Sequence, residues 1–203
     1  MTPEKTALIL IGYQNDYFAK NGILRGVLEN QERTDDVLHR TIGLIAAIKK
    51  TKVVMIATPI IFSSDYSEVI QGGGILSVIR DVGAFKVGQT GSEMVKELAV
   101  FTDRIVEVSG KRGLNAFVET KLEDELTRRG IKDVIIAGAV TSICIDSTGR
   151  AAYELGFCVS ILQDCTAART DAEQEFFCNT IFPTYATLID SESAIEKLTQ
   201  ATG

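Results

Sequence analysis

The alternation of short apolar runs with longer segments of helical period constrains the fold of this chain most strongly. Six runs rich in β-branched or other apolar residues have the length of strands: Ala7–Ile11, Val53–Ala57, Arg104–Val108, Val134–Ala137, Val159–Leu162 and Ala186–Ile189. Most are continuously apolar, which is typical of parallel strands that are covered on both faces. Between them lie the helix candidates Asp35–Lys50, Thr120–Gly130, Ile143–Gly156, Asp171–Thr180 and Ser191–Thr199. This order predicts an α/β fold with three layers, α/β/α, around a mainly parallel six-stranded sheet.

Length and charge narrow the class of protein. The chain has 203 residues, which suits a single domain over residues 1–203, and its formal net charge is −6. An acidic chain without a basic tract is not expected to bind nucleic acid or an anionic membrane surface. The first apolar run, Ala7–Tyr13, is too short for a signal peptide or a membrane span, so we expect a cytoplasmic protein.

Two local patterns add detail. The segment Pro59–Ser92 interrupts the alternation and is rich in glycine, which predicts a loop that covers the site or forms an oligomer contact. Thr120 is followed three residues later by Glu123, which predicts a capping box at the start of a helix.

Cys144 is the first candidate for chemistry. A buried strand ends near Gly138, a turn of small residues follows, and a helix begins at about Cys144. The positive end of a helix dipole favours the thiolate form of such a cysteine, and free backbone N–H groups there can hold an oxyanion. A buried cysteine on the inner face of a helix explains the position equally well. The other three cysteines, Cys158, Cys165 and Cys178, are expected to be free thiols that pack as small buried hydrophobic side chains.

Two further loops follow predicted strands and so lie at the same edge of the sheet. Lys111 could stabilise a thiolate or transfer a proton, although most loop lysines are simply solvated. Asn15 and Asp16 follow the first strand directly and could face the same crevice, or form a turn or a helix cap.

Taken together, these segments resemble the isochorismatase-like cysteine hydrolases. The resemblance rests on Gln14-Asn-Asp after the first strand, Lys111 with Asn115-Ala-Phe117 after the third, and Gly138-x-x-Thr141-x-x-Cys144 after the fourth. It continues through Thr148-x-Arg150-x-Ala152 and Gln163-Asp-Cys-Thr-Ala-Ala168, in order, over essentially the whole chain.

The resemblance implies a Rossmann-like fold and a triad of Asp, Lys and Cys. Its cysteine corresponds to Cys144 and its lysine to Lys111. It also implies a cis peptide bond between Ala139 and Val140 that directs the Val140 N–H, with that of Cys144, into an oxyanion hole. The implied activity is cleavage of a C–N bond in a small amide or carbamoyl compound through a Cys144 thioester. A vinyl-ether hydrolase of isochorismatase type is disfavoured, because it needs no nucleophile.

The carboxylate of the triad has no counterpart, because its position in Ile11-Gly12-Tyr13-Gln14-Asn15-Asp16 is occupied by Gly12. Three explanations remain open. Another carboxylate, either Asp16 or Glu107, could enter the gap. A water molecule could relay the proton. Alternatively, the chain is a catalytically impaired pseudoenzyme that binds a small molecule or forms oligomers.

The remaining expectations concern the pocket, the metal and the partners. We expect Gly12, Tyr13, Phe62, Tyr66 and Thr141 to line a substrate pocket, although Phe62 and Tyr66 could instead pack under the glycine-rich insert. The metal-binding histidines that nicotinamidases of this family carry after the second strand are missing from residues 57–65, so we expect no metal and no cofactor. The expected partners are a small-molecule substrate and further copies of the chain, in a dimer or tetramer.

Overall fold

A computed structural model describes residues 1–69 and 73–200 and contains the expected sheet. Its strands are β1 (Thr6–Ile11), β2 (Val54–Thr58), β3 (Ile105–Glu107), β4 (Asp133–Ala139), β5 (Cys158–Ala167) and β6 (Thr187–Ile189). They form one six-stranded sheet in the order β3-β2-β1-β4-β5-β6, and every neighbouring pair is parallel. The predicted fold class is confirmed.

Strand β1 shows why the predicted strands are apolar at every position. Its two edges pair with β2 and β4, and the helices of the two outer layers cover both of its faces. Leu8 and Leu10 pack into the core on one side of the sheet, whereas Ala7, Ile9 and Ile11 pack into the core on the other. Alternate side chains of a strand point to opposite faces, so burial on both faces requires an uninterrupted apolar run.

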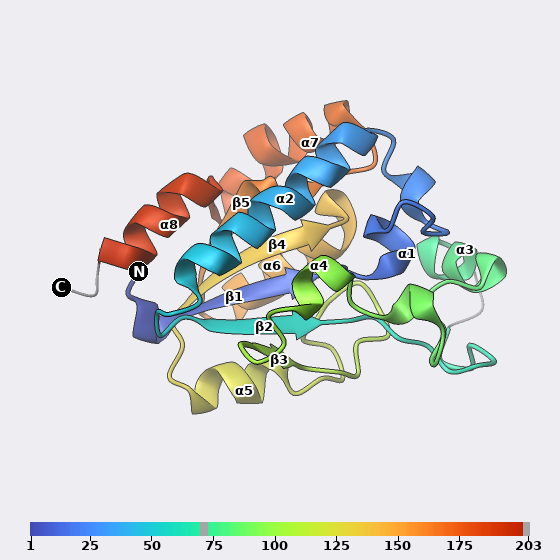
Figure 1. Cartoon of the computed structure of the whole chain (residues 1–203), viewed down its shortest axis with the longest axis horizontal. Helices are drawn as coiled ribbons and strands as arrows, with labels where there is room; N and C mark the ends of the chain where they lie inside the picture. Colours follow the sequence, from blue (N-terminus) through green and yellow to red (C-terminus); the bar gives the residue numbers. More distant parts are fainter. Residues whose placement is uncertain (70–72, 201–203) are drawn as a thin grey trace.

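The helices form the two outer layers and one end of the molecule (Figure 1). They are α1 (Asn15–Phe18), α2 (Gln31–Ile48), α3 (Ile75–Val82), α4 (Lys96–Ala99), α5 (Leu122–Arg128), α6 (Asp146–Glu154), α7 (Asp171–Phe176) and α8 (Ser191–Gln200). Helices α2 and α8 contribute to one core, and α5 and α6 to the other. In Figure 1 the strand arrows point toward the end where α1 and α3 lie. None of the helices in the described ranges has the length and hydropathy needed to cross a bilayer.

Several predicted boundaries shift for local reasons. Helix α2 begins at Gln31 rather than Asp35, because the Asn30 side chain accepts a hydrogen bond from the Arg33 N–H at 2.9 Å and so caps the helix. The prediction of a capping box at Thr120 is wrong. The Thr120 hydroxyl donates to the Ala116 carbonyl and accepts from the Leu122 N–H, and the helix begins two residues later.

The glycine-rich insert contains an element that the sequence analysis missed. Its described part includes helix α3, which Gly74 precedes and Gly83 follows, with φ of 77° and 78°. Phe62 and Phe85 connect the two arms of the insert through a backbone hydrogen bond of 2.8 Å. The insert therefore folds back over the carboxyl ends of the strands, as expected of a segment that covers a site.

Candidate active site

Cys144 lies in a tight turn directly after β4. The peptide bond between Ala139 and Val140 is cis, as the resemblance implied, and a π-helical turn, Thr141–Ile145, leads into α6. The N–H groups of Ile143 and Ile145 both donate to the Val140 carbonyl. This arrangement holds the Cys144 side chain at the carboxyl end of the sheet, where it is only 7% exposed.

Lys111 reaches Cys144 from the loop after β3. A parallel bridge to Ile60 joins this loop to the segment after β2. The Lys111 side chain is buried, and its Nζ lies 3.6 Å from the Cys144 Sγ and donates to the Gly113 carbonyl at 2.6 Å. A buried ammonium group needs such acceptors to compensate for lost hydration. The lysine therefore supplies a positive charge directly at the sulfur.

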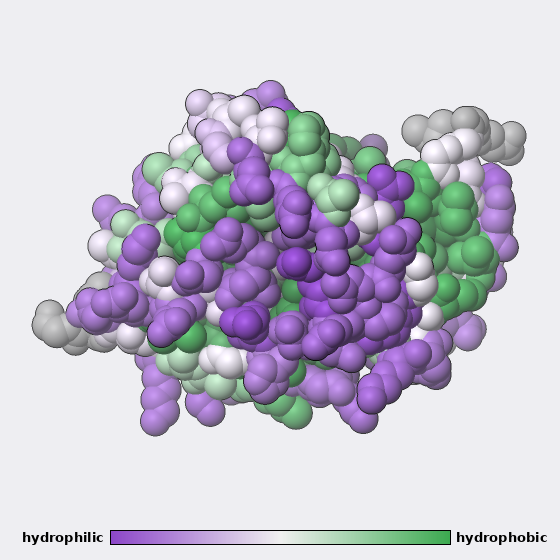
Figure 2. Space-filling view, turned by 90° about the horizontal axis from the view of Figure 1, so that it is seen from above, coloured by the Kyte–Doolittle hydropathy of each residue, from purple (hydrophilic) through white to green (hydrophobic). Residues whose placement is uncertain are grey.

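The cavity around this pair is small and mostly apolar. Its volume is about 10 Å³, which is enough for about one water molecule. Besides Cys144, Lys111, Gly12 and Tyr17, its lining consists of apolar residues: Ile11, Ile60, Ile75, Leu76, Ile79, Phe85, Leu114, Ala139 and Ile143. Helix α3 provides three of them and so covers Cys144. Figure 2 shows an apolar surface at the end of the molecule where α3 lies, and Val78 and Val82 of this helix are exposed.

Gly12 separates this cavity from a larger one. It lines both the cavity at Cys144 and a neighbouring space of about 350 Å³ beside β1, β2 and α4. Its φ is +73°, and a Cβ built on it would lie 2.7 Å from the Ala139 carbonyl oxygen and 3.5 Å from Cδ2 of Tyr17. Only glycine adopts this conformation without strain, and the space for a side chain is already taken.

Neither of the two carboxylates considered as substitutes lines the cavity at Cys144. The Asp16 carboxylate accepts a hydrogen bond from the Phe85 N–H at 2.6 Å and so ties α1 to the insert. Glu107 is exposed and lines the larger cavity on the other side of Gly12. Among the described residues, no Asp or Glu lines the cavity that holds Cys144. The expectation that Asp16 or Glu107 fills the gap is therefore not what the structure shows.

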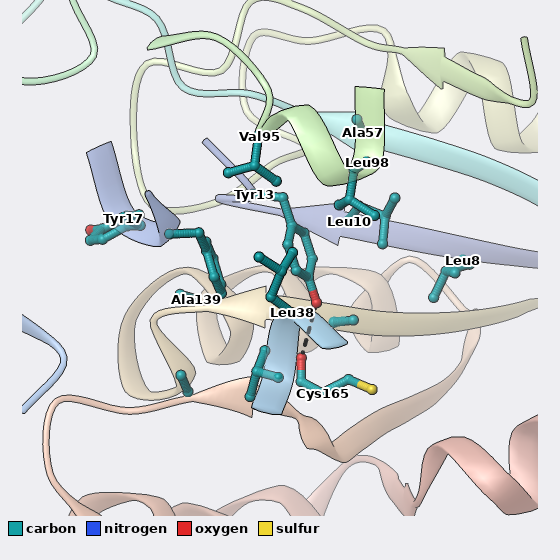
Figure 3. Packing of buried hydrophobic residues seen from close by; sticks show 14 of the residues in the cluster. Leu8, Leu10, Tyr13, Tyr17, Leu38, Ala57, Val95, Leu98, Ala139 and Cys165 are labelled. Atoms are coloured by element: carbon teal, nitrogen blue, oxygen red, sulfur yellow. Dashed lines mark hydrogen bonds between the residues drawn. The ribbon is translucent and has the colours of Figure 1, made fainter. Parts of the chain in front are cut away.

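Tyr13 and Thr141 are held by hydrogen bonds away from Cys144. Tyr13 lines the larger cavity, and its hydroxyl lies 2.5 Å from that of Thr41 and donates to the Cys165 carbonyl at 3.2 Å (Figure 3). The buried Thr141 hydroxyl donates to the Gln174 side-chain oxygen at 2.7 Å. Thr141 therefore shapes the nucleophile turn and does not form a wall of either cavity.

Phe62 and Tyr66 pack inside the insert. Their ring centroids lie 5.6 Å apart, both side chains are buried, and the Tyr66 hydroxyl donates to the Ala84 carbonyl at 2.7 Å. Neither residue lines the described parts of the two cavities beside Gly12. Of the two positions expected for these rings, the structure shows packing under the insert, because the fold of the insert turns them inward.

Sequence reasoning missed Tyr17 and the α3 side chains as site residues. Tyr17 lines the cavity with Cys144 and Lys111 and is 4% exposed. Burial raises the pKa of Tyr17 well above its usual value, and the charges of Cys144 and Asp16 raise it further. Tyr17 directly follows Gln14-Asn15-Asp16, the segment expected to face the crevice, and this position could have identified it as a site residue. For α3, the spacing of Ile75 and Ile79 was a helical signal within the glycine-rich insert.

Metal ligands do not gather at this site. Within residues 1–69 and 73–200, His, Cys, Asp and Glu side chains nowhere form a group of three or more that could hold a metal ion.

Comparison with known proteins decides the family. The profile of the isochorismatase domain matches residues 6–193. The chain belongs to the isochorismatase family. Nicotinamidase 3 of Arabidopsis thaliana is 25% identical to it over 186 residues, which cover 92% of this chain and 85% of the relative. The ureidoacrylate amidohydrolase RutB of Cronobacter turicensis is 24% identical over 176 residues, 81% of this chain and 75% of the relative.

The fold of this isochorismatase-family chain also matches a solved structure. The crystal structure of a cysteine hydrolase from Pseudomonas syringae pv. phaseolicola superimposes with a TM-score of 0.87 at 20% identity, over 99% of this chain and 95% of that one. At this identity the likeness shows the shared fold.

Proposed function

We propose that the chain is a cysteine hydrolase that cleaves a C–N bond of a small amide or carbamoyl compound through a thioester on Cys144. The observation that carries the proposal is the buried pair of Lys111 Nζ and Cys144 Sγ, 3.6 Å apart. An ammonium group beside a thiol favours the thiolate, which is the nucleophilic form. Two relatives, a nicotinamidase and a ureidoacrylate amidohydrolase, support by their names a C–N bond as the target.

The proposed reaction has two stages. The Cys144 thiolate attacks the carbonyl carbon, a C–S bond forms, and the π pair moves to oxygen, where the Val140 and Cys144 N–H groups bind it. The C–N bond then breaks and the leaving nitrogen takes a proton from the Lys111 ammonium. In the second stage water attacks the thioester, gives one proton back to Lys111, and the C–S bond breaks, which releases the acid and restores the thiolate.

In this proposal Gly12 stands at the carboxylate position of the triad, so the site lacks a carboxylate as its dedicated proton-transfer group and Lys111 takes over that step. Such groups contribute roughly 10²–10⁴-fold to rates. We therefore propose slow turnover that depends on Lys111 and on water.

A second candidate is a pseudoenzyme that binds a small molecule without turnover. Two observations favour it: no carboxylate of the described chain lines the cavity, and the cavity of about 10 Å³ has room for little more than a water molecule. A substrate must therefore displace part of the lining, and helix α3 is the element in the way.

The experiment that separates these candidates is incubation with a panel of primary amides, ureido acids and carbamoyl amino acids. The hydrolase is expected to release ammonia and to accumulate an adduct on the peptide that carries Cys144. Cys144→Ala should abolish both signals, whereas Cys158→Ala is the matched control, because Cys158 is an exposed thiol outside the site. Thermal shifts without ammonia or adducts across the panel would reject the hydrolase in favour of the binder.

A further inference from the structure

Tyr17 occupies the space beside Gly12 that a side chain at position 12 would enter. Its ring edge lies 3.5 Å from the position of a Cβ on Gly12. The ring of Phe85 packs against it with centroids 5.2 Å apart. Tyr17 is therefore held firmly between the end of β1 and the insert, in the wall of the cavity that contains Cys144 and Lys111.

The hydroxyl of Tyr17 has no hydrogen-bond partner within the described part of the chain, although the side chain is only 4% exposed. The neighbouring Tyr13 differs, because its hydroxyl contacts Thr41 and Cys165. In Figure 3 the Tyr13 hydroxyl points toward Cys165, whereas Tyr17 lies apart from it, with its hydroxyl directed away from Tyr13. Because no group of the described chain engages this hydroxyl, its O–H is free to donate to an acceptor on a ligand in the cavity.

The Tyr17 hydroxyl can act there only as a neutral group. Burial raises its pKa, and the negative charges of Cys144 and Asp16 raise it further. The other charged group that lines this cavity is the Lys111 ammonium. The Asp16 carboxylate is engaged by the Phe85 N–H. The phenol therefore remains protonated around neutral pH and offers its O–H as a donor, whereas a carboxylate in its place would accept hydrogen bonds.

We infer that Tyr17 determines substrate specificity. Tyr17 and Lys111 both offer only hydrogen-bond donors to a ligand in the cavity. They therefore select substrates that carry a carboxylate or another strong acceptor next to the scissile bond, and they disfavour substrates that carry an amide NH₂ at that place. This inference rests on the proposed function of Cys144 as the nucleophile. It follows from two features of the cavity. The Tyr17 O–H, a donor, lies beside Gly12, where the resemblance implies a carboxylate, an acceptor. In addition, the described lining residues include no acidic side chain. Beside the Cys144 sulfur, an anionic group of the substrate would meet the Lys111 ammonium and the free Tyr17 O–H.

Two alkylating reagents of nearly equal size provide the probe. Iodoacetate carries a carboxylate and iodoacetamide carries an amide NH₂, and both react with thiolates. Peptide mapping of the intact, folded chain gives the two rates at Cys144 and, as an internal reference, at the exposed Cys158. The ratio of the iodoacetate rate to the iodoacetamide rate is expected to be roughly tenfold higher at Cys144 than at Cys158, because hydrogen bonds to charged groups are strong.

Tyr17→Phe removes only the hydroxyl and should lower the ratio at Cys144 several-fold while the ratio at Cys158 stays constant. Tyr13→Phe is the matched control, because it removes a buried hydroxyl of the same segment that faces away from Cys144; it should leave both ratios unchanged. If Tyr17→Phe does not fold, the inference is still tested by the unaltered chain, in which the iodoacetate-to-iodoacetamide rate ratio at Cys144 is compared with the ratio at Cys158.

The outcomes separate the two claims. Equal ratios at Cys144 and Cys158, or an unchanged ratio at Cys144 in Tyr17→Phe, would overturn the inference even where Cys144 reacts rapidly. If Cys144 shows no enhanced reactivity toward either reagent, the proposed function itself is overturned.

Discussion

At the scale of single residues, the backbone at Gly12 decides what the site can contain. Its φ of +73° and the Ala139 oxygen 2.7 Å from a built Cβ leave no room for a side chain. Tyr17 then takes the adjacent space, and the acidic side chains that could have served are placed elsewhere: Asp16 on the Phe85 N–H and Glu107 on the far side of Gly12. Introducing a carboxylate at position 12 would therefore require the surrounding backbone to change.

This geometry predicts the effect of alanine at position 12. Gly12→Ala should lower the free energy of unfolding by at least about 1–2 kcal/mol, because an L-residue there is held in the left-handed region. The contact with the Ala139 oxygen adds to that cost. Gly43→Ala is the matched control: Gly43 is exposed in α2, and a Cβ there meets no atom within 4 Å outside its own helix backbone. It should stabilise by up to about 1 kcal/mol through helix propensity.

Urea denaturation of the two variants checks this prediction. A Gly12→Ala protein as stable as the unaltered chain would show that the backbone at β1 relaxes readily, and would remove the steric reason for the missing side chain.

At the scale of elements, helix α3 controls access to Cys144. It packs Ile75, Leu76 and Ile79 into the cavity while it exposes Val78 and Val82 to solvent. The glycines at its two ends, Gly74 and Gly83, both have positive φ, and a Cβ at either would meet nothing within 4 Å. They are therefore required by the turns that place α3, and not by close packing.

Shortening one cavity-lining side chain of α3 should open the site. Ile79→Ala is expected to increase the rate at which iodoacetamide alkylates Cys144 and to cost about 2–4 kcal/mol of stability, because Ile79 is buried. Val78→Ala, on the exposed face of the same helix, should change stability by no more than about 0.5 kcal/mol and leave the alkylation rate constant. Equal effects of the two substitutions on the rate would contradict the covering role of Ile79.

At the scale of the whole molecule, the parallel sheet brings together loops that are far apart in sequence. The segment after β1 supplies Gly12 and Tyr17, the segment after β3 supplies Lys111, and the segment after β4 supplies Cys144. All three strands have their carboxyl ends on the same side of the sheet (Figure 1). This is the edge at which open α/β sheets bind ligands.

This topology explains how much the sequence could predict. Continuous apolar runs identify the strands, and residues that follow strands directly, such as Lys111 and Cys144, can be placed at the edge. The insert could not be placed, because its path depends on long-range contacts such as the hydrogen bond from the Phe85 N–H to Asp16. For the same reason the sequence left open which of their two expected positions Phe62, Tyr66 and Asp16 take. Tyr17 was overlooked because it lines the cavity beside Gly12, a position without a side chain, and this arrangement is visible only in the structure.

The pairing of Lys111 with Cys144 is the central claim, and substitution of the lysine tests it most directly. Lys111→Met keeps the length of the side chain and removes the charge 3.6 Å from the sulfur. The rate of Cys144 alkylation by iodoacetamide at pH 7, measured by peptide mapping against Cys158 in the same sample, should fall roughly tenfold or more, because the thiolate loses its charged partner. The Cys158 rate should not change. An undiminished rate at Cys144 in Lys111→Met would contradict the account.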